Sequence, residues 1–191
     1  MIERGNWVVP YFNDEYRFDK PPLTYWLMAV GYGAIGFGEL GARLHTVISA
    51  VGMTLLIFFF GCRIVSRSQA FAAAFVWATC VQVFLHGRLA VADMPMILAV
   101  AAMHWALWEL IFEDAGRRWG LVLWLSAAIG FLAKGPIAIA VPAVTLLTLR
   151  ALGGRGSVPW RRLGTAWGLP LALALVGAWG IPALLRTDGA F

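Results

Sequence analysis

The stretch Phe18-Asp19-Lys20-Pro21-Pro22 places an acid, a base and two prolines directly before an apolar run at residues 23–38. The residue before a proline avoids helical backbone geometry, whereas proline suits the first turn of a helix. We therefore expect residues 1–22 to form a loop and a helix to begin near Pro22. This loop is rich in tryptophan, tyrosine and phenylalanine, which are typical of a membrane–water interface.

The rest of the chain is predominantly apolar. Of its 191 residues, 61% are hydrophobic and only 13% are charged, whereas soluble domains carry roughly a quarter charged residues. Apolar segments separated by short polar loops indicate an all-α integral membrane protein with a single membrane domain. The sequence predicts about six transmembrane helices, at residues 44–62, 69–85, 94–112, 119–133, 137–150 and 165–185.

Basic residues are unevenly divided between the loops. The loops at 63–68, 113–118 and 150–162 hold eight arginines, whereas the alternating loops at 86–93, 134–136 and 186–191 hold three Lys or Arg residues. The positive-inside rule assigns the first set to the cytoplasm. The net charge of +5 is therefore explained by membrane orientation, and we expect no nucleic-acid partner.

Residues 23–40 decide on which side Lys20 lies. The apolar run at 23–38 would form a helix of about 24 Å, which is shorter than the hydrocarbon core of about 30 Å. We expect an interfacial juxtamembrane helix, with Lys20 on the outer side together with Asp93 and Lys134. If the helix crosses the membrane instead, Lys20 lies on the opposite side.

Three polar sites interrupt the apolar sequence, and each has a structural alternative. Lys134 either lies in a recessed pocket, where its charge would act strongly on a phosphate, or extends its ammonium group to the membrane surface. Asp93 precedes Met94-Pro95 and fits a helix cap. Arg88 could pair with Asp93 or bind a phosphate.

The adjacent Asp19 and Lys20 point to opposite faces of an extended backbone. This arrangement suits a carboxylate that binds a metal or an acceptor beside an ammonium that binds an anion, and it equally suits a solvated loop pair. The three histidines lack the spacing of metal ligands, and we interpret His86 as an interface residue.

Five motifs together resemble a known family. They are WVVP (7–10), YRFDKPPLTYWL (16–27), GARL (41–44), GRLAVADMP (87–95) and FLAKGP (131–136). They resemble the N-terminal membrane module of family 39-type glycosyltransferases, which are GT-C fold enzymes that include the lipid A aminoarabinose transferase and protein mannosyltransferases. The resemblance covers nearly the whole chain.

The resemblance implies a multi-pass enzyme of the bacterial inner membrane with a GT-C-type helix bundle, a periplasmic juxtamembrane helix and a periplasmic active site. Such an enzyme moves a sugar from a polyprenyl-phosphate donor to a lipid or protein acceptor. It implies donor-phosphate binding by Lys20, Lys134 and Arg88. Asp19 and Asp93 become the catalytic candidates, membrane lipids become partners, and a divalent metal on Asp19 becomes the expected cofactor.

Two departures from the family pattern bear on activity. The family more often has glutamate where Asp19 stands, so the shorter side chain weakens the expected metal role. The family's general base is an aspartate that would lie upstream of Met1, so we expect the chain to be a fragment truncated at both ends. The alternative function is a transporter or flippase fragment whose charges line a pathway, although such proteins usually show inverted repeats.

Overall fold

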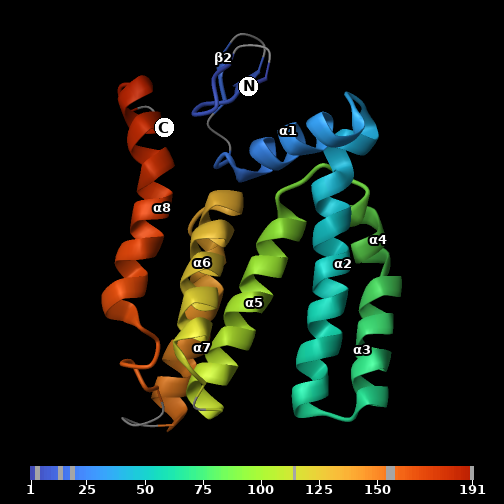
Figure 1. The fold of residues 1–191 in the computed structure, drawn as a ribbon, viewed down its shortest axis with the longest axis vertical. Coiled ribbons are helices and arrows are strands. Elements are labelled where there is room, and N and C mark those ends of the chain that lie inside the picture. Colours follow the sequence, from blue (N-terminus) through green and yellow to red (C-terminus); the bar gives the residue numbers. More distant parts are fainter. Residues whose placement is uncertain (3–4, 13–14, 18–19, 114, 154–157, 190–191) are drawn as a thin grey trace.

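A computed structural model of the chain describes residues 1–2, 5–12, 15–17, 20–113, 115–153 and 158–189 (Figure 1). A small antiparallel hairpin pairs Tyr11 with Tyr16 and precedes a bundle of helices. The elements are β1 Tyr11–Phe12, β2 Glu15–Tyr16, α1 Leu23–Ile35, α2 Glu39–Ile64, α3 Arg67–Thr79, α4 Val81–Gly87, α5 Asp93–Phe112, α6 Arg117–Lys134, α7 Ile137–Gly153 and α8 Thr165–Arg186.

The helices confirm the expected all-α membrane architecture. Among the described residues, α2, α5 and α8 are long and apolar enough to cross a membrane, while α1 and α7 are shorter apolar helices. The expected segment 69–85 is divided into α3 and α4, which bend by 57° at Cys80, where the backbone is extended. If this bent pair is one span, the described chain has up to four candidates, and the expected number of about six crossings stays a prediction.

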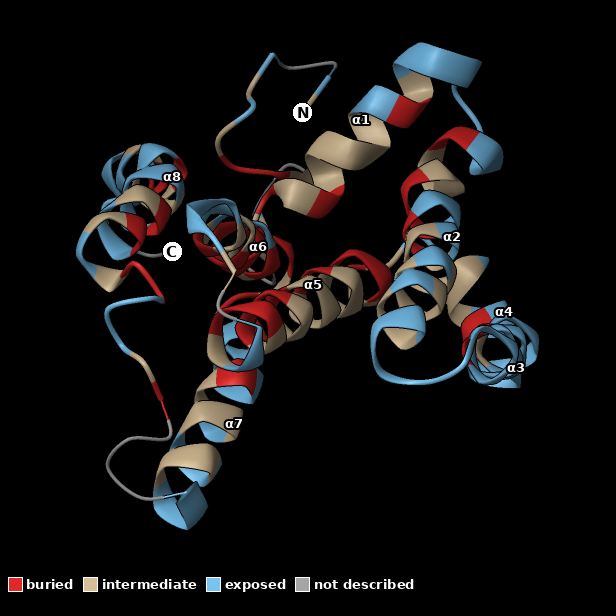
Figure 2. Ribbon diagram, turned by 60° about the horizontal axis from the view of Figure 1, so that its bottom comes forward, coloured by how far each residue is buried: buried red, intermediate tan, exposed pale blue. Residues whose placement is uncertain are grey.

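The densest packing lies between α5 and α6. These two helices are antiparallel neighbours, and their shared core contains Met103, Leu107, Leu110 and Leu123. Figure 2 shows buried residues concentrated on α5 and α6, whereas α3 and much of α2 are exposed. The exposed side chains of α3 are apolar and include Phe71 and Phe75, as expected for a surface that faces lipid.

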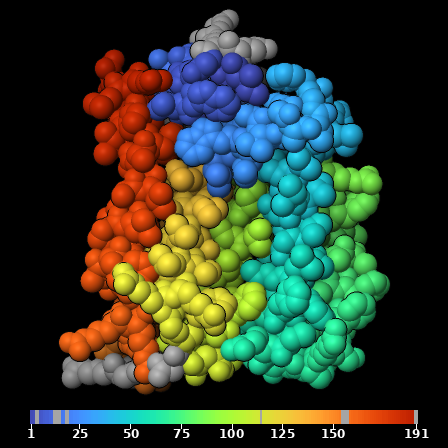
Figure 3. Space-filling model, viewed as in Figure 1, coloured from blue at the N-terminus to red at the C-terminus, as the bar shows by residue number. Residues whose placement is uncertain are grey.

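Helix α1 lies across the upper ends of α6 and α2 instead of running along them (Figures 1 and 3). Its 13 residues correspond to about 20 Å, less than the membrane core. The backbones of α1 and α2 approach closely where Gly31 meets the Gly41 carbonyl group, and Gly36, with φ of +92°, lets the chain turn into α2. This orientation favours an interfacial α1.

Candidate functional site

The first residue of α5 and the last residue of α6 meet at one end of the bundle. The Lys134 ammonium donates to Asp93 Oδ1 and forms an ion pair with it. Both side chains are only partly buried, with 28% of Asp93 and 35% of Lys134 exposed. The pair therefore remains accessible to a ligand that approaches this end of the bundle.

The local sequence explains why these charges stand there. An acidic side chain is favoured at the N-terminus of a helix and a basic one at the C-terminus, and Asp93 and Lys134 occupy these positions in α5 and α6. Gly135 follows with φ of +79°, a conformation that favours glycine. The chain therefore leaves α6 at Lys134 and starts α7 directly after Pro136.

The structure decides between the alternatives for Asp93. Its side chain makes no cap hydrogen bond, and Ala92 holds the capping position of α5. The Arg88 guanidinium lies 4.1 Å from the centre of the Phe84 ring, and no described contact joins it to Asp93. The predicted roles of a simple helix cap and of an Arg88–Asp93 pair are therefore both wrong in this structure, where Asp93 pairs with Lys134.

The N-terminal segment is fixed at the same end of the bundle. Val9 is fully buried and packs in a cluster with Leu132 of α6 and Trp179 of α8. The Trp179 indole donates to the Val8 carbonyl oxygen at 2.8 Å, and the Trp26 indole donates to the Trp7 carbonyl oxygen at 2.8 Å. In Figure 3 this segment lies between α1 and the end of α8.

Lys20 belongs to this anchored region. It lies two residues before Pro22, which is buried at the start of α1, and Leu23 packs against the cluster that contains Leu132. Leu132 is itself two residues from Lys134. The fold thus brings the Lys20 segment and the Asp93–Lys134 pair to one end of the molecule. Asp19 lies outside the described residues, so its predicted roles are untested.

The structure gives limited material for a metal site. No group of three or more His, Cys, Asp or Glu side chains that could hold a metal ion occurs within the described part of the chain. Among these residues, Asp93 is engaged by Lys134, and the His86 Nδ1 atom lies 3.1 Å from the Gln82 carbonyl oxygen of its own helix. A divalent metal on Asp19 stays a prediction.

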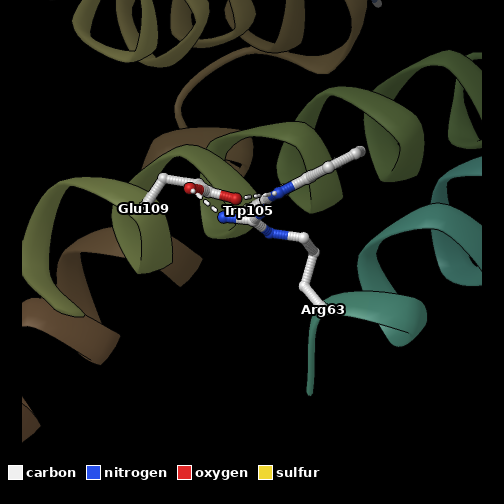
Figure 4. A network of polar contacts seen from close by, with 3 residues as sticks. All are labelled: Arg63, Trp105 and Glu109. Atoms are coloured by element: carbon white, nitrogen blue, oxygen red, sulfur yellow. Dashed lines mark hydrogen bonds and ion pairs between the residues drawn. The ribbon is translucent and has the colours of Figure 1, made fainter. Parts of the chain in front are cut away.

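One polar network was not predicted from the sequence (Figure 4). Glu109, which is 3% exposed, accepts from Arg63 Nη2 at 3.1 Å and from the Trp105 indole at 3.0 Å. The sequence left open whether Glu109 faces lipid or the bundle interior. A tryptophan four residues before a glutamate, in an otherwise apolar helix, is the signal that indicates an interior position.

This network lies near the ends of α2 and α5 opposite to Asp93, since Arg63 is in the last turn of α2 and Glu109 is near the end of α5. The two charge sites of α5 thus face different neighbours at its two ends. Glu109 joins α5 to α2, and Asp93 joins α5 to α6.

Comparison with known proteins gives a family match that covers most of the chain. The sequence profile of the family described as dolichyl-phosphate-mannose-protein mannosyltransferase matches residues 19–180. An undecaprenyl phosphate-α-4-amino-4-deoxy-L-arabinose arabinosyl transferase from Erwinia tasmaniensis is 34% identical over 153 residues, which cover 77% of this chain and 27% of that protein. An uncharacterised protein from Aquifex aeolicus is 30% identical over 171 residues, covering 87% of this chain and 39% of that protein.

Solved structures show the same fold. The apo structure of ArnT from Cupriavidus metallidurans superimposes with a TM-score of 0.90 at 24% identity, over 98% of this chain and 36% of that one. The structure of the same protein bound to undecaprenyl phosphate gives a TM-score of 0.86 at 25% identity, over 98% and 35% of the respective chains. These matches confirm the GT-C-type bundle.

The present chain spans less than two fifths of the length of these relatives. The matched region includes both the Lys20 segment and the Asp93–Lys134 pair, except that the family profile starts at residue 19. None of the matched proteins is named as a transporter, so the alternative of a transporter or flippase fragment has no support among them.

Proposed function

Since this chain belongs to the dolichyl-phosphate-mannose-protein mannosyltransferase family, we propose that it forms the donor-phosphate end of a glycosyltransferase that uses a polyprenyl-phosphate-linked sugar. The observation that carries this proposal is the gathering of Lys134, Asp93 and the Lys20 segment at one end of the bundle. A relative of the same fold is described as bound to undecaprenyl phosphate, which is the carrier class that such an end would accommodate.

The charge balance of the reaction suits two lysines. An acceptor oxygen attacks the anomeric carbon, the bond from that carbon to the phosphate oxygen breaks, and the electron pair stays on the phosphate. The polyprenyl phosphate therefore becomes more negative as it leaves. Ammonium groups that stand beside the leaving oxygen stabilise this charge as it develops. We assign this role to Lys134 and Lys20.

Asp93 has two tasks in the proposed reaction. In the absence of a ligand it holds the Lys134 ammonium at the end of α6. When the donor phosphate takes over Lys134, the Asp93 carboxylate is released to orient the acceptor or to accept its proton. Asp19 is a second carboxylate for the same task by its position beside Lys20. No step requires a metal, because the described residues offer no group of ligands for one.

The acceptor and the side of the membrane follow from weaker but consistent indications. Several relatives are named as aminoarabinose transferases, which favours a lipid acceptor over a protein acceptor. The loops rich in arginine lie at the end of the bundle opposite to Lys134, so the positive-inside rule assigns Lys134 to the periplasmic face of the bacterial inner membrane.

Transfer activity tests the proposal. In the full-length protein that contains this chain, Lys20→Ala and Lys134→Ala should each lower kcat/KM for a polyprenyl-phosphate sugar by roughly 10- to 100-fold, as expected for loss of one charge-assisted contact. Arg67→Ala is the matched control, because Arg67 is exposed at the opposite end of the bundle. Activity like that of the wild type in both lysine variants would refute the assignment.

A further inference from the structure

A second group of cationic side chains surrounds a hollow outside the site already described. The hollow lies where α1 turns into α2 and has a volume of about 410 Å³. We refer to it as the elbow groove. Its lining combines two arginines with aliphatic side chains, namely Arg43, Arg88, Ile35, Leu40, Leu44 and Val47.

The two arginines come from segments that the fold holds together. Arg43 is in the first turns of α2, and Arg88 directly follows α4. The fully buried Thr46 hydroxyl lies 3.1 Å from the Gly87 carbonyl oxygen, so α2 is attached to the residue that precedes Arg88. The positions of the two backbones are therefore fixed relative to each other.

The charges near the groove favour an anion. Arg43 Nη2 lies 3.0 Å from Glu39 Oε2, but the Glu39 side chain is 79% exposed, and such surface pairs are weak and easily exchanged. Arg88 rests on the Phe84 ring, a contact that leaves the edge of the guanidinium free to donate to oxygen atoms. A phosphate between these arginines would gain two charged donors.

The aliphatic part of the groove continues along a helix that is long enough to cross the membrane. Leu40 is 77% exposed and Val47 is 49% exposed, and further exposed apolar residues follow on α2 at Ile48, Val51 and Leu55. Arg43 lies about one helical turn from the start of α2, which is the depth at which an arginine reaches lipid headgroups. The groove therefore presents cations above an apolar track.

We propose that the elbow groove binds a membrane lipid through its phosphate-bearing headgroup, with an acyl chain along the exposed face of α2. The volume of the groove accommodates a headgroup of ordinary size. The lining includes neither Asp93 nor Lys134, so this lipid is distinct from the sugar donor. The inference concerns lipid binding alone and does not depend on the transfer reaction.

Lipid retention measured by native mass spectrometry tests this site. The full-length protein in neutral detergent is titrated with phosphatidylglycerol and, separately, with phosphatidylcholine, without donor or acceptor. The wild type should retain phosphatidylglycerol preferentially. The Arg43→Gln/Arg88→Gln variant should bind it about tenfold more weakly, and Arg43→Lys/Arg88→Lys should lose less, because it keeps both charges.

The matched control is Arg67→Gln/Arg118→Gln, which removes the same charge from exposed positions at the opposite end of the bundle and should change the affinity by less than about twofold. Equal losses in both pairs would overturn the proposal, since they would indicate general surface charge. Unchanged retention in the groove variant would also overturn it. Displacement of the lipid by millimolar inorganic phosphate would show a site for free phosphate and would refute a lipid site.

Discussion

Glu109 and Arg63 form the most completely buried charge contact among the described residues, and its two partners are buried unequally. The Glu109 side chain is 4% exposed, whereas the Arg63 side chain is 50% exposed. An arginine that loses its carboxylate can still be hydrated, but a buried carboxylate that loses its arginine cannot. The two halves of the pair should therefore respond differently to substitution.

We expect Arg63→Met to lower the free energy of unfolding by about 2–3 kcal/mol, since it leaves the Glu109 charge buried with the Trp105 indole as its remaining donor. Glu109→Gln should cost about 1 kcal/mol, because the amide oxygen can still accept a hydrogen bond. Reversible unfolding in mixed detergent micelles measures both values. Arg67→Met is the control and should stay within about 0.5 kcal/mol. A larger loss for Glu109→Gln than for Arg63→Met would contradict this account.

The residues of the candidate site illustrate what sequence alone can predict. Lys20, Asp93 and Lys134 stand out because they are charged residues in an apolar sequence. Their partners do not stand out, because the Asp93–Lys134 contact joins residues that are 41 positions apart. It follows only once α5 and α6 are known to be antiparallel, and the sequence favoured a helix cap for Asp93.

At the scale of the elements, the crossing of α1 over α2 depends on glycine. A Cβ atom on Gly31 would overlap the Gly41 carbonyl oxygen, whereas a Cβ atom on Gly33 would meet nothing within 4 Å. Both glycines lie in α1, and the sequence treated them alike, as small residues for close helix packing. The structure confirms this role for Gly31, while Gly33 has no such neighbour.

Alanine substitutions at these two positions form a matched pair. Gly31→Ala should reduce the free energy of unfolding by about 1–3 kcal/mol, because the two helix backbones must move apart. Gly33→Ala should be neutral or stabilise the protein by up to about 1 kcal/mol, since alanine is favoured over glycine in a helix. Unfolding in mixed micelles again provides the measurement. Equal effects at the two positions would show that α1 does not cross α2 in this way.

The helix boundaries show where pattern analysis stops. The run from 69 to 85 has uniform apolar character without proline or glycine, and nothing in it indicates the bend at Cys80. The bend follows from the extended backbone of that residue, a property of the packed structure. The start of α3 is different, because Ser66 and Gln69 form a capping box that is recognisable in the sequence.

At the scale of the whole molecule, the account assigns one end of the bundle to the site and the other to arginine-rich loops. Substituted cysteines test this assignment in a background that lacks Cys62 and Cys80. Lys20→Cys and Lys134→Cys should react with a membrane-impermeant maleimide in intact cells, whereas Arg67→Cys and Arg118→Cys should react only after permeabilisation. Reaction of Lys20→Cys and Lys134→Cys from opposite sides would mean that α1 crosses the membrane.

Binding of undecaprenyl phosphate tests the central claim most directly, because it isolates the phosphate contact from the transfer step. The full-length protein and its Lys20→Ala, Lys134→Ala and Arg67→Ala variants are titrated with this lipid in detergent. We expect each lysine variant to bind roughly 10- to 100-fold more weakly, as for loss of one charge-assisted hydrogen bond, while Arg67→Ala binds like the wild type. Undiminished binding in Lys20→Ala and Lys134→Ala would contradict the account.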